Sequence, residues 1–83
     1  MAATRDEIER WFEQGLVDNA THMIVVCDTY DWEDYPVYVM PGQNPREVAE
    51  EYGGKGMRKI MEVYSLKMDM VKQLNEHRAF HYD

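Results

Sequence analysis

Twenty residues, Thr21–Met40 (THMIVVCDTYDWEDYPVYVM), carry the strongest structural signal in this sequence. Both ends of the segment are apolar and rich in β-branched or aromatic residues, as is typical of strands. Tyr30–Tyr35 in the middle is acidic and aromatic, too polar for a sheet interior and of the right length for a hairpin loop. The segment therefore predicts two antiparallel strands, at about Thr21–Thr29 and Pro36–Met40.

The first of these strands is expected to be central, because alternation leaves both of its faces largely apolar. One face carries His22, Ile24, Val26 and Asp28, and the other carries Met23, Val25, Cys27 and Thr29. Pro36 opens the second strand and has no amide donor, which suits an edge position.

A helix is predicted before the hairpin, running from Arg5 to about Asp18. Thr4 and Glu7 have the spacing of a capping box, and Asn19 can end the helix in the left-handed conformation. Gly15 weakens the interior of this helix by about 1 kcal/mol. The expected apolar stripe consists of Ile8, Trp11, Phe12 and Leu16.

Two more helices and one strand are predicted after the hairpin. Asn44 followed by proline begins a short helix at about Pro45–Tyr52, with Val48, Ala49 and Tyr52 as its apolar contacts. The glycines that follow match no phosphate-binding motif and indicate a helix terminator. Residues 58–65 suit a strand with Met61 and Val63 facing inward, although a helix is also compatible. A last helix is expected at about Lys67–Arg78, and Ala79–Tyr82 is expected to pack back on the domain.

The predicted fold is a single α+β domain over residues 1–83 with the order α-β-β-α-β-α. Pairing the third strand with the first gives a three-stranded antiparallel sheet of order 2-1-3, with the helices expected on one face.

The charge is strongly asymmetric along the chain. The net charge is −7; residues 1–54 hold 12 acidic and 3 basic side chains, a net of −9, whereas residues 55–83 have a net of +2. Such a chain is a poor ligand for nucleic acids and for anionic membranes, so the expected partners are basic protein surfaces. The seven Met and ten aromatic residues are compatible with a homodimer as well as with a monomer. There is no signal region and no apolar run of membrane-spanning length, which predicts a soluble cytoplasmic protein.

No residue pattern indicates catalysis, so we expect a protein that is not an enzyme and uses no cofactor. The single cysteine, Cys27, has apolar neighbours and is expected to be a buried thiol. Ser65 is the only serine and lies in no nucleophile motif. His77 and His81 are four residues apart, but no second cysteine or nearby carboxylate completes a zinc ligand set.

The acidic turn is the candidate partner-binding site. Its carboxylates lack the spacing and the glycine of a calcium loop, so a metal site is disfavoured there. The alternatives are a solvated hairpin tip and a protein-binding tip with aromatic anchors. The candidate contact residues are Asp28, Tyr30, Asp31, Trp32, Glu33, Asp34 and Tyr35.

The segments WFEQGL, ATHMIVVCDTYDWEDYPVYVMPG, KIMEVYSL and HRAFHYD together resemble small uncharacterised proteins of tailed phages and prophages. This resemblance implies a viral protein acting in the host cytoplasm. The leading hypothesis is an anti-defence inhibitor that occupies a basic, nucleic-acid-binding surface of a host protein complex. The alternatives are a sponge for a nucleotide signal, with the anion near Lys55, Arg58 or Lys59, and a virion structural or assembly protein.

Overall fold

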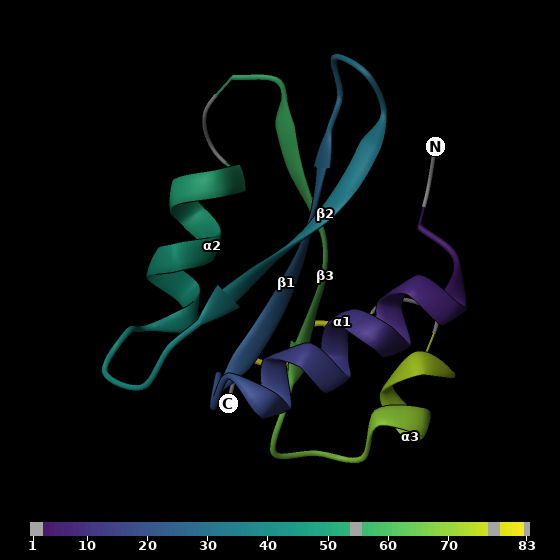
Figure 1. The fold of residues 1–83 in the computed structure, drawn as a ribbon. Coiled ribbons are helices and arrows are strands. Elements are labelled where there is room, and N and C mark those ends of the chain that lie inside the picture. The colour runs from purple at the N-terminus through teal and green to yellow at the C-terminus, as the bar shows by residue number, and fades with distance from the viewer. Residues whose placement is uncertain (1–2, 54–55, 77–78, 83) are drawn as a thin grey trace.

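The computed structural model describes residues 3–53, 56–76 and 79–82 and has the predicted α+β architecture (Figure 1). Its elements are α1 (Arg5–Val17), β1 (His22–Asp28), β2 (Glu33–Val39), α2 (Pro45–Gly53), β3 (Arg58–Ser65) and α3 (Met70–Leu74). The strands form one sheet in the order β2-β1-β3, and both pairings are antiparallel. The predicted topology and strand order are confirmed, and residues 58–65 form a strand.

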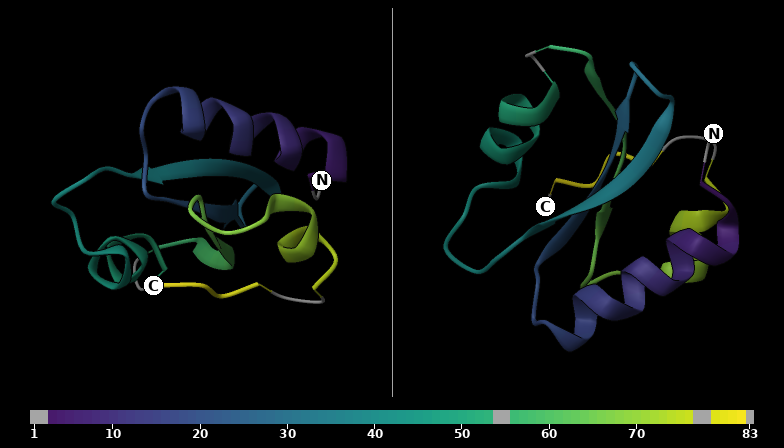
Figure 2. Two further views of the ribbon diagram at one scale, coloured as in Figure 1. Left: turned by 90° about the horizontal axis from the view of Figure 1, so that it is seen from below. Right: turned by 45° about the horizontal axis from the view of Figure 1, so that its top comes forward.

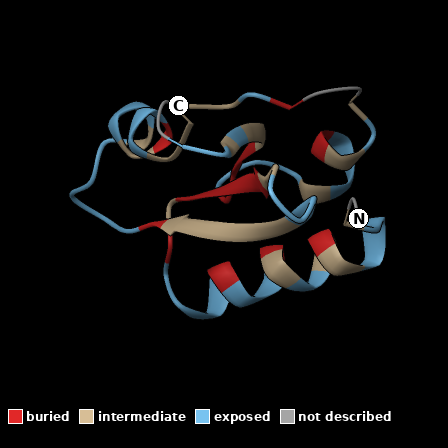
Figure 3. Ribbon diagram, turned by 90° about the horizontal axis from the view of Figure 1, so that it is seen from above, coloured by how far each residue is buried: buried red, intermediate tan, exposed pale blue. Residues whose placement is uncertain are grey.

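β1 is the central strand and is buried along almost its whole length (Figure 3). Ile24 lies opposite Val37 of β2 and Val63 of β3, so one apolar row crosses the sheet. Pro36 lies in the edge strand β2, as predicted, but in the middle of the strand and not at its start. A bulge in the pairing of β1 with β3 leaves Met61 without a partner residue on β1. Met61 and Val63 consequently pack on opposite faces of the sheet, and not together.

Helices cover both faces of the sheet, which corrects the expectation that they lie on one face (Figure 2). On one face, α1 and α3 pack over Met23, Val25 and Tyr64. On the other face, α2 packs over Ile24 and Val26. The reason is the composition of β1, because a strand that is apolar on both faces needs cover on both.

α1 begins with the predicted capping box and ends close to the predicted residue. The amide of Glu7 donates to Thr4 Oγ1 over 3.2 Å, and the amide of Thr4 donates to Glu7 Oε1 over 3.3 Å. Asn19 follows the helix with φ 60°. The expected stripe was wrong at its last position, because Leu16 is exposed and Gly15 is buried in its place. A Cβ atom at this inward position would lie within 3 Å of the side chains of Leu66 and of Tyr38 in β2, so glycine fits there best.

α3 is much shorter than the predicted helix Lys67–Arg78, of which Arg78 lies outside the described residues. The Asp69 side chain accepts a hydrogen bond from the Lys72 amide over 3.0 Å and caps the helix, which therefore begins only after Asp69. The fully buried side chain of Gln73 bonds both to the amide and to the carbonyl of Ser65, at 2.8 Å each. This amide side chain fixes α3 to the end of β3.

The C-terminal segment packs back on the domain, as predicted. The amide of Val63 donates to the carbonyl of Ala79 over 2.7 Å, and the amide of His81 donates to the carbonyl of Val63 over 2.9 Å. Residues 79–82 thereby lie parallel to β3 along its outer edge. The segment also brings Tyr82 to the face of the sheet that α2 covers.

Candidate functional site

The hairpin loop between β1 and β2 is shorter than predicted. It spans residues 29–32, and residues 33–35, which were expected in the loop, belong to β2. The loop can be short because two carboxylates bond to its backbone: Asp28 Oδ1 accepts from the Tyr30 amide over 2.9 Å, and Asp31 Oδ1 accepts from the Glu33 amide over 3.2 Å. These two hydrogen bonds brace the backbone of the hairpin tip.

Two aromatic side chains project from this ordered tip into solvent. Tyr30 is 79% exposed and Trp32 is 61% exposed. Trp32 also has φ 60°, in the left-handed region that glycine and asparagine adopt most easily and a bulky residue adopts rarely. A bulky residue at such a position is costly to the fold, and Trp32 belongs to neither of the two core clusters.

The structure divides the predicted contact residues into two groups. Tyr30, Asp31, Trp32 and Glu33 are exposed together at the tip, next to the half-buried Asp28. The other two residues have structural roles. Asp34 accepts a hydrogen bond from the Ala3 amide over 3.0 Å, and Tyr35 packs against the core on the α2 face. We call Tyr30, Asp31, Trp32 and Glu33 the tip residues.

Met57 is a neighbour of the tip that sequence reasoning missed. Its carbonyl accepts a hydrogen bond from the Thr29 amide over 2.6 Å, and its side chain is 58% exposed. The antiparallel pairing of β1 with β3 brings the residue before β3 beside the residue after β1. The position of Met57 beside the tip thus follows from the predicted strand order only when the register of β3 against β1 is also known.

The carboxylates at the tip have no internal counter-ion among the residues that the structure describes. Within the described residues Arg5 forms an ion pair with Glu9 at 3.5 Å, and the His81 ring is hydrogen-bonded to Glu76 at 2.9 Å. Both pairs lie away from the hairpin in sequence. The side chains of Asp31 and Glu33 thus present uncompensated negative charge beside two exposed aromatic rings.

The chemistry-bearing side chains elsewhere show no catalytic arrangement in the described part of the chain. Cys27 is a buried free thiol, as expected, and burial together with the neighbouring Asp34 carboxylate raises its pKa, which disfavours the thiolate. No group of three or more His, Cys, Asp or Glu side chains among the described residues could hold a metal ion. His77 lies outside those residues. None of the described helices is long and apolar enough to cross a membrane.

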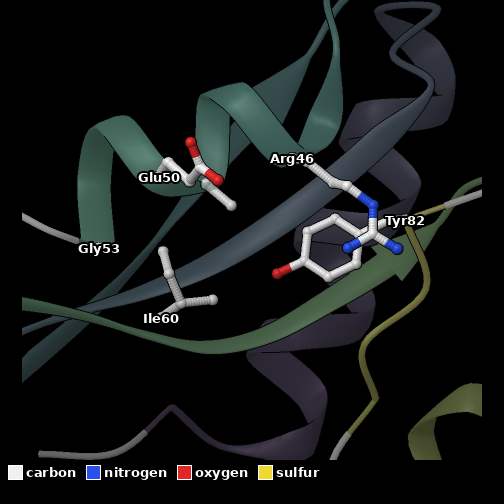
Figure 4. A pocket seen from close by; sticks show the side chains of 6 residues that line it. Arg46, Glu50, Gly53, Ile60 and Tyr82 are labelled. Atoms are coloured by element: carbon white, nitrogen blue, oxygen red, sulfur yellow. The ribbon is translucent and has the colours of Figure 1, made fainter.

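A groove of about 460 Å³ lies on the opposite face of the sheet from α1, between α2, β3 and the C-terminal segment (Figure 4). Its lining residues are Arg46, Ala49, Glu50, Gly53, Ile60 and Tyr82. The guanidinium carbon of Arg46 lies 4.5 Å from the centre of the Tyr82 ring. Of the three cations expected near an anionic ligand, Arg58 stacks on Tyr52 at 5.3 Å, Lys59 is exposed on β3, and Lys55 lies outside the described residues.

Comparison of the chain with protein-family models, with curated proteins and with solved structures found no match.

Proposed function

We propose that this protein acts by binding, with the tip residues docking on a basic surface of another protein. The observation that carries the proposal is Trp32, an indole that is 61% exposed and held at φ 60°. Tryptophan and tyrosine are the side chains most often found at the energetic centre of protein interfaces. The loop is already ordered by its own carboxylates, so binding loses little conformational entropy there.

The charge around the rings selects the kind of partner. Asp31 and Glu33 are exposed beside the aromatic side chains, and residues 1–54 carry a net charge of −9. Such a surface attracts a basic partner over long range and disfavours acidic ones. A surface that binds nucleic acid is basic for the same physical reason, because it must neutralise phosphates.

The resemblance to tailed-phage proteins supports a host protein as the partner. A protein that covers the nucleic-acid-binding surface of a defence complex inhibits it without any catalytic group. Such an inhibitor needs only a surface that matches its target, and the exposed carboxylates and aromatic rings of the hairpin tip support this proposal. The proposed function is therefore that of a small acidic inhibitor acting by occupation of a basic surface.

The test is affinity capture from a bacterial host lysate with a tip variant and a charge-matched control. Asp31→Asn with Glu33→Gln removes two charges from the tip, and the new asparagine side chain keeps an oxygen that can accept the Glu33 amide. Glu13→Gln with Glu51→Gln removes two charges from exposed sites on α1 and α2. We expect a basic protein to be captured by the natural chain and by the control pair, and to be lost with the tip pair or at about 0.5 M salt.

Capture that survives in the tip variant would show that the contact surface lies elsewhere. Equal loss in both variants would show that only net charge matters, which contradicts a localised site. Formation of large homogeneous oligomers by the purified protein would favour the virion assembly alternative.

A further inference from the structure

We propose that the groove beside α2 binds a nucleoside monophosphate whose base carries an amino group. This site is separate from the hairpin tip, and the inference does not depend on the proposed protein partner. Its volume of about 460 Å³ lies within the range of small-molecule sites. The lining combines an apolar floor with one cation, one anion and one aromatic ring.

The floor and walls are suited to a flat ring. Ile60 of β3 and Ala49 of α2 provide apolar surface, and Tyr82 closes one end with its hydroxyl directed along the groove (Figure 4). Gly53 allows α2 to lie close to β3, because a Cβ atom there would be 2.7 Å from Ile60 Cγ1. A planar base can stack on such a floor without displacing a side chain.

Arg46 is the group that favours an anion. Its guanidinium carbon lies over the Tyr82 ring, 4.5 Å from the ring centre, a cation–π contact that does not use the N–H donors as hydrogen bonds. Within the described residues, the Arg46 side chain forms no salt bridge and no hydrogen bond, although the protein has 16 acidic residues. A phosphate is the ligand group that such a planar, unpaired fork of donors binds best.

Glu50 favours a ligand that carries an amino group as well as a phosphate. Its carboxylate and the Arg46 guanidinium extend in different directions from α2 (Figure 4). A nucleotide carries complementary groups for both side chains, because the amino group of its base and its phosphate lie at opposite ends of the molecule. We therefore place the base over Ile60 with its amino group toward Glu50 and the phosphate toward Arg46.

The test uses three related ligands and two pairs of variants. AMP carries both recognised groups, IMP lacks the amino group, and adenosine lacks the phosphate. We expect AMP to shift the NMR signals of the Ile60 and Ala49 methyl groups and to bind about tenfold more tightly than IMP or adenosine. Arg46→Gln should weaken AMP binding about tenfold and leave adenosine unaffected, and Glu50→Ala should bring AMP to the level of IMP.

Arg10→Gln and Glu51→Ala are the matched controls, because both residues are exposed and neither lines the groove. Neither control should change AMP binding. The proposal is overturned if AMP at millimolar concentration leaves the groove signals unshifted, or if the controls weaken binding as much as the groove variants. A failure here leaves the hairpin proposal intact, because the capture experiment does not involve the groove.

Discussion

Trp32 combines high exposure with a backbone conformation that most side chains avoid. For a residue other than glycine, the left-handed region costs about 1–2 kcal/mol. Asparagine adopts this region more readily than other non-glycine residues. We therefore expect Trp32→Asn to leave the free energy of unfolding unchanged or to raise it by up to about 1 kcal/mol, as measured by urea denaturation.

The same substitution should abolish capture of the basic partner, because it removes the largest exposed ring of the tip. Trp32→Asn would thus abolish binding while the free energy of unfolding stays the same or rises, as expected where a strained residue is kept for function. A loss of more than about 1 kcal/mol of stability would instead show that Trp32 supports the hairpin.

The individual residues of the site could be predicted from the sequence only in part. The acidic and aromatic composition of the turn identified Tyr30, Asp31, Trp32 and Glu33 correctly as an exposed group. It could not separate them from Tyr35, because the alternation that buries Tyr35 depends on where β2 begins. The carboxylates of Asp28 and Asp31 accept hydrogen bonds from the backbone amides of Tyr30 and Glu33 and fix that boundary, which composition does not specify.

At the scale of elements, the packing of α1 on the sheet depends on Gly15. A Cβ atom there would lie 2.8 Å from Leu66 Cδ1 and 2.9 Å from Tyr38 Cε1. The Tyr38 ring cannot move away easily, because its hydroxyl donates to the Trp11 carbonyl over 2.7 Å. Gly15→Ala improves helix propensity by about 1 kcal/mol, but we expect a net destabilisation of about 1–3 kcal/mol from the clash.

Thermal or urea unfolding measures the change in stability that Gly15→Ala causes. The same substitution in a chain that already carries Leu66→Ala tests whether the clash is the reason. In a Leu66→Ala chain, where one of the two clashing groups is absent, Gly15→Ala should cost less than in the natural chain. If Gly15→Ala stabilised the natural chain, helix propensity alone would govern this position.

The bounds of the helices could be predicted from the sequence more fully than the packing contacts between the helices and the sheet. Capping residues and apolar periodicity located α1 and α2 to within a residue or two, because those signals are local. The side on which α2 packs and the inward position at Gly15 are set by long-range contacts with Ile24 and Tyr38. The length of α3 was overestimated because the Asp69 cap and the Gln73 contacts to β3 overrode an extended helical pattern.

For the whole molecule, the structure predicts a loss of stability at alkaline pH. Burial and the Glu62 carboxylate raise the pKa of Tyr64 well above its usual range, and burial also raises the pKa of Tyr38. The unfolded chain loses these protons above about pH 10, whereas the folded protein retains them. The free energy of unfolding should therefore fall as the pH rises through 10, by about 1.4 kcal/mol per pH unit for Tyr64.

Urea denaturation between about pH 8 and pH 11 measures this slope. Tyr64→Phe should be less stable at neutral pH, because it loses the 2.7 Å bond from the hydroxyl to Glu62 Oε2, but its stability should decline less steeply with pH. An identical slope in both proteins would show that Tyr64 is not the group responsible.

The central claim is that the hairpin tip, and not the acidic surface as a whole, contacts a basic partner. Photo-crosslinking from a benzoylphenylalanine placed at position 30, which leaves Trp32 in place, tests this contact most directly, with the same residue at the exposed position 13 of α1 as the control. We expect irradiation in a bacterial host lysate to give a covalent adduct with one basic protein from position 30 and none from position 13. No adduct from position 30, or the same adducts from both positions, would contradict the claim.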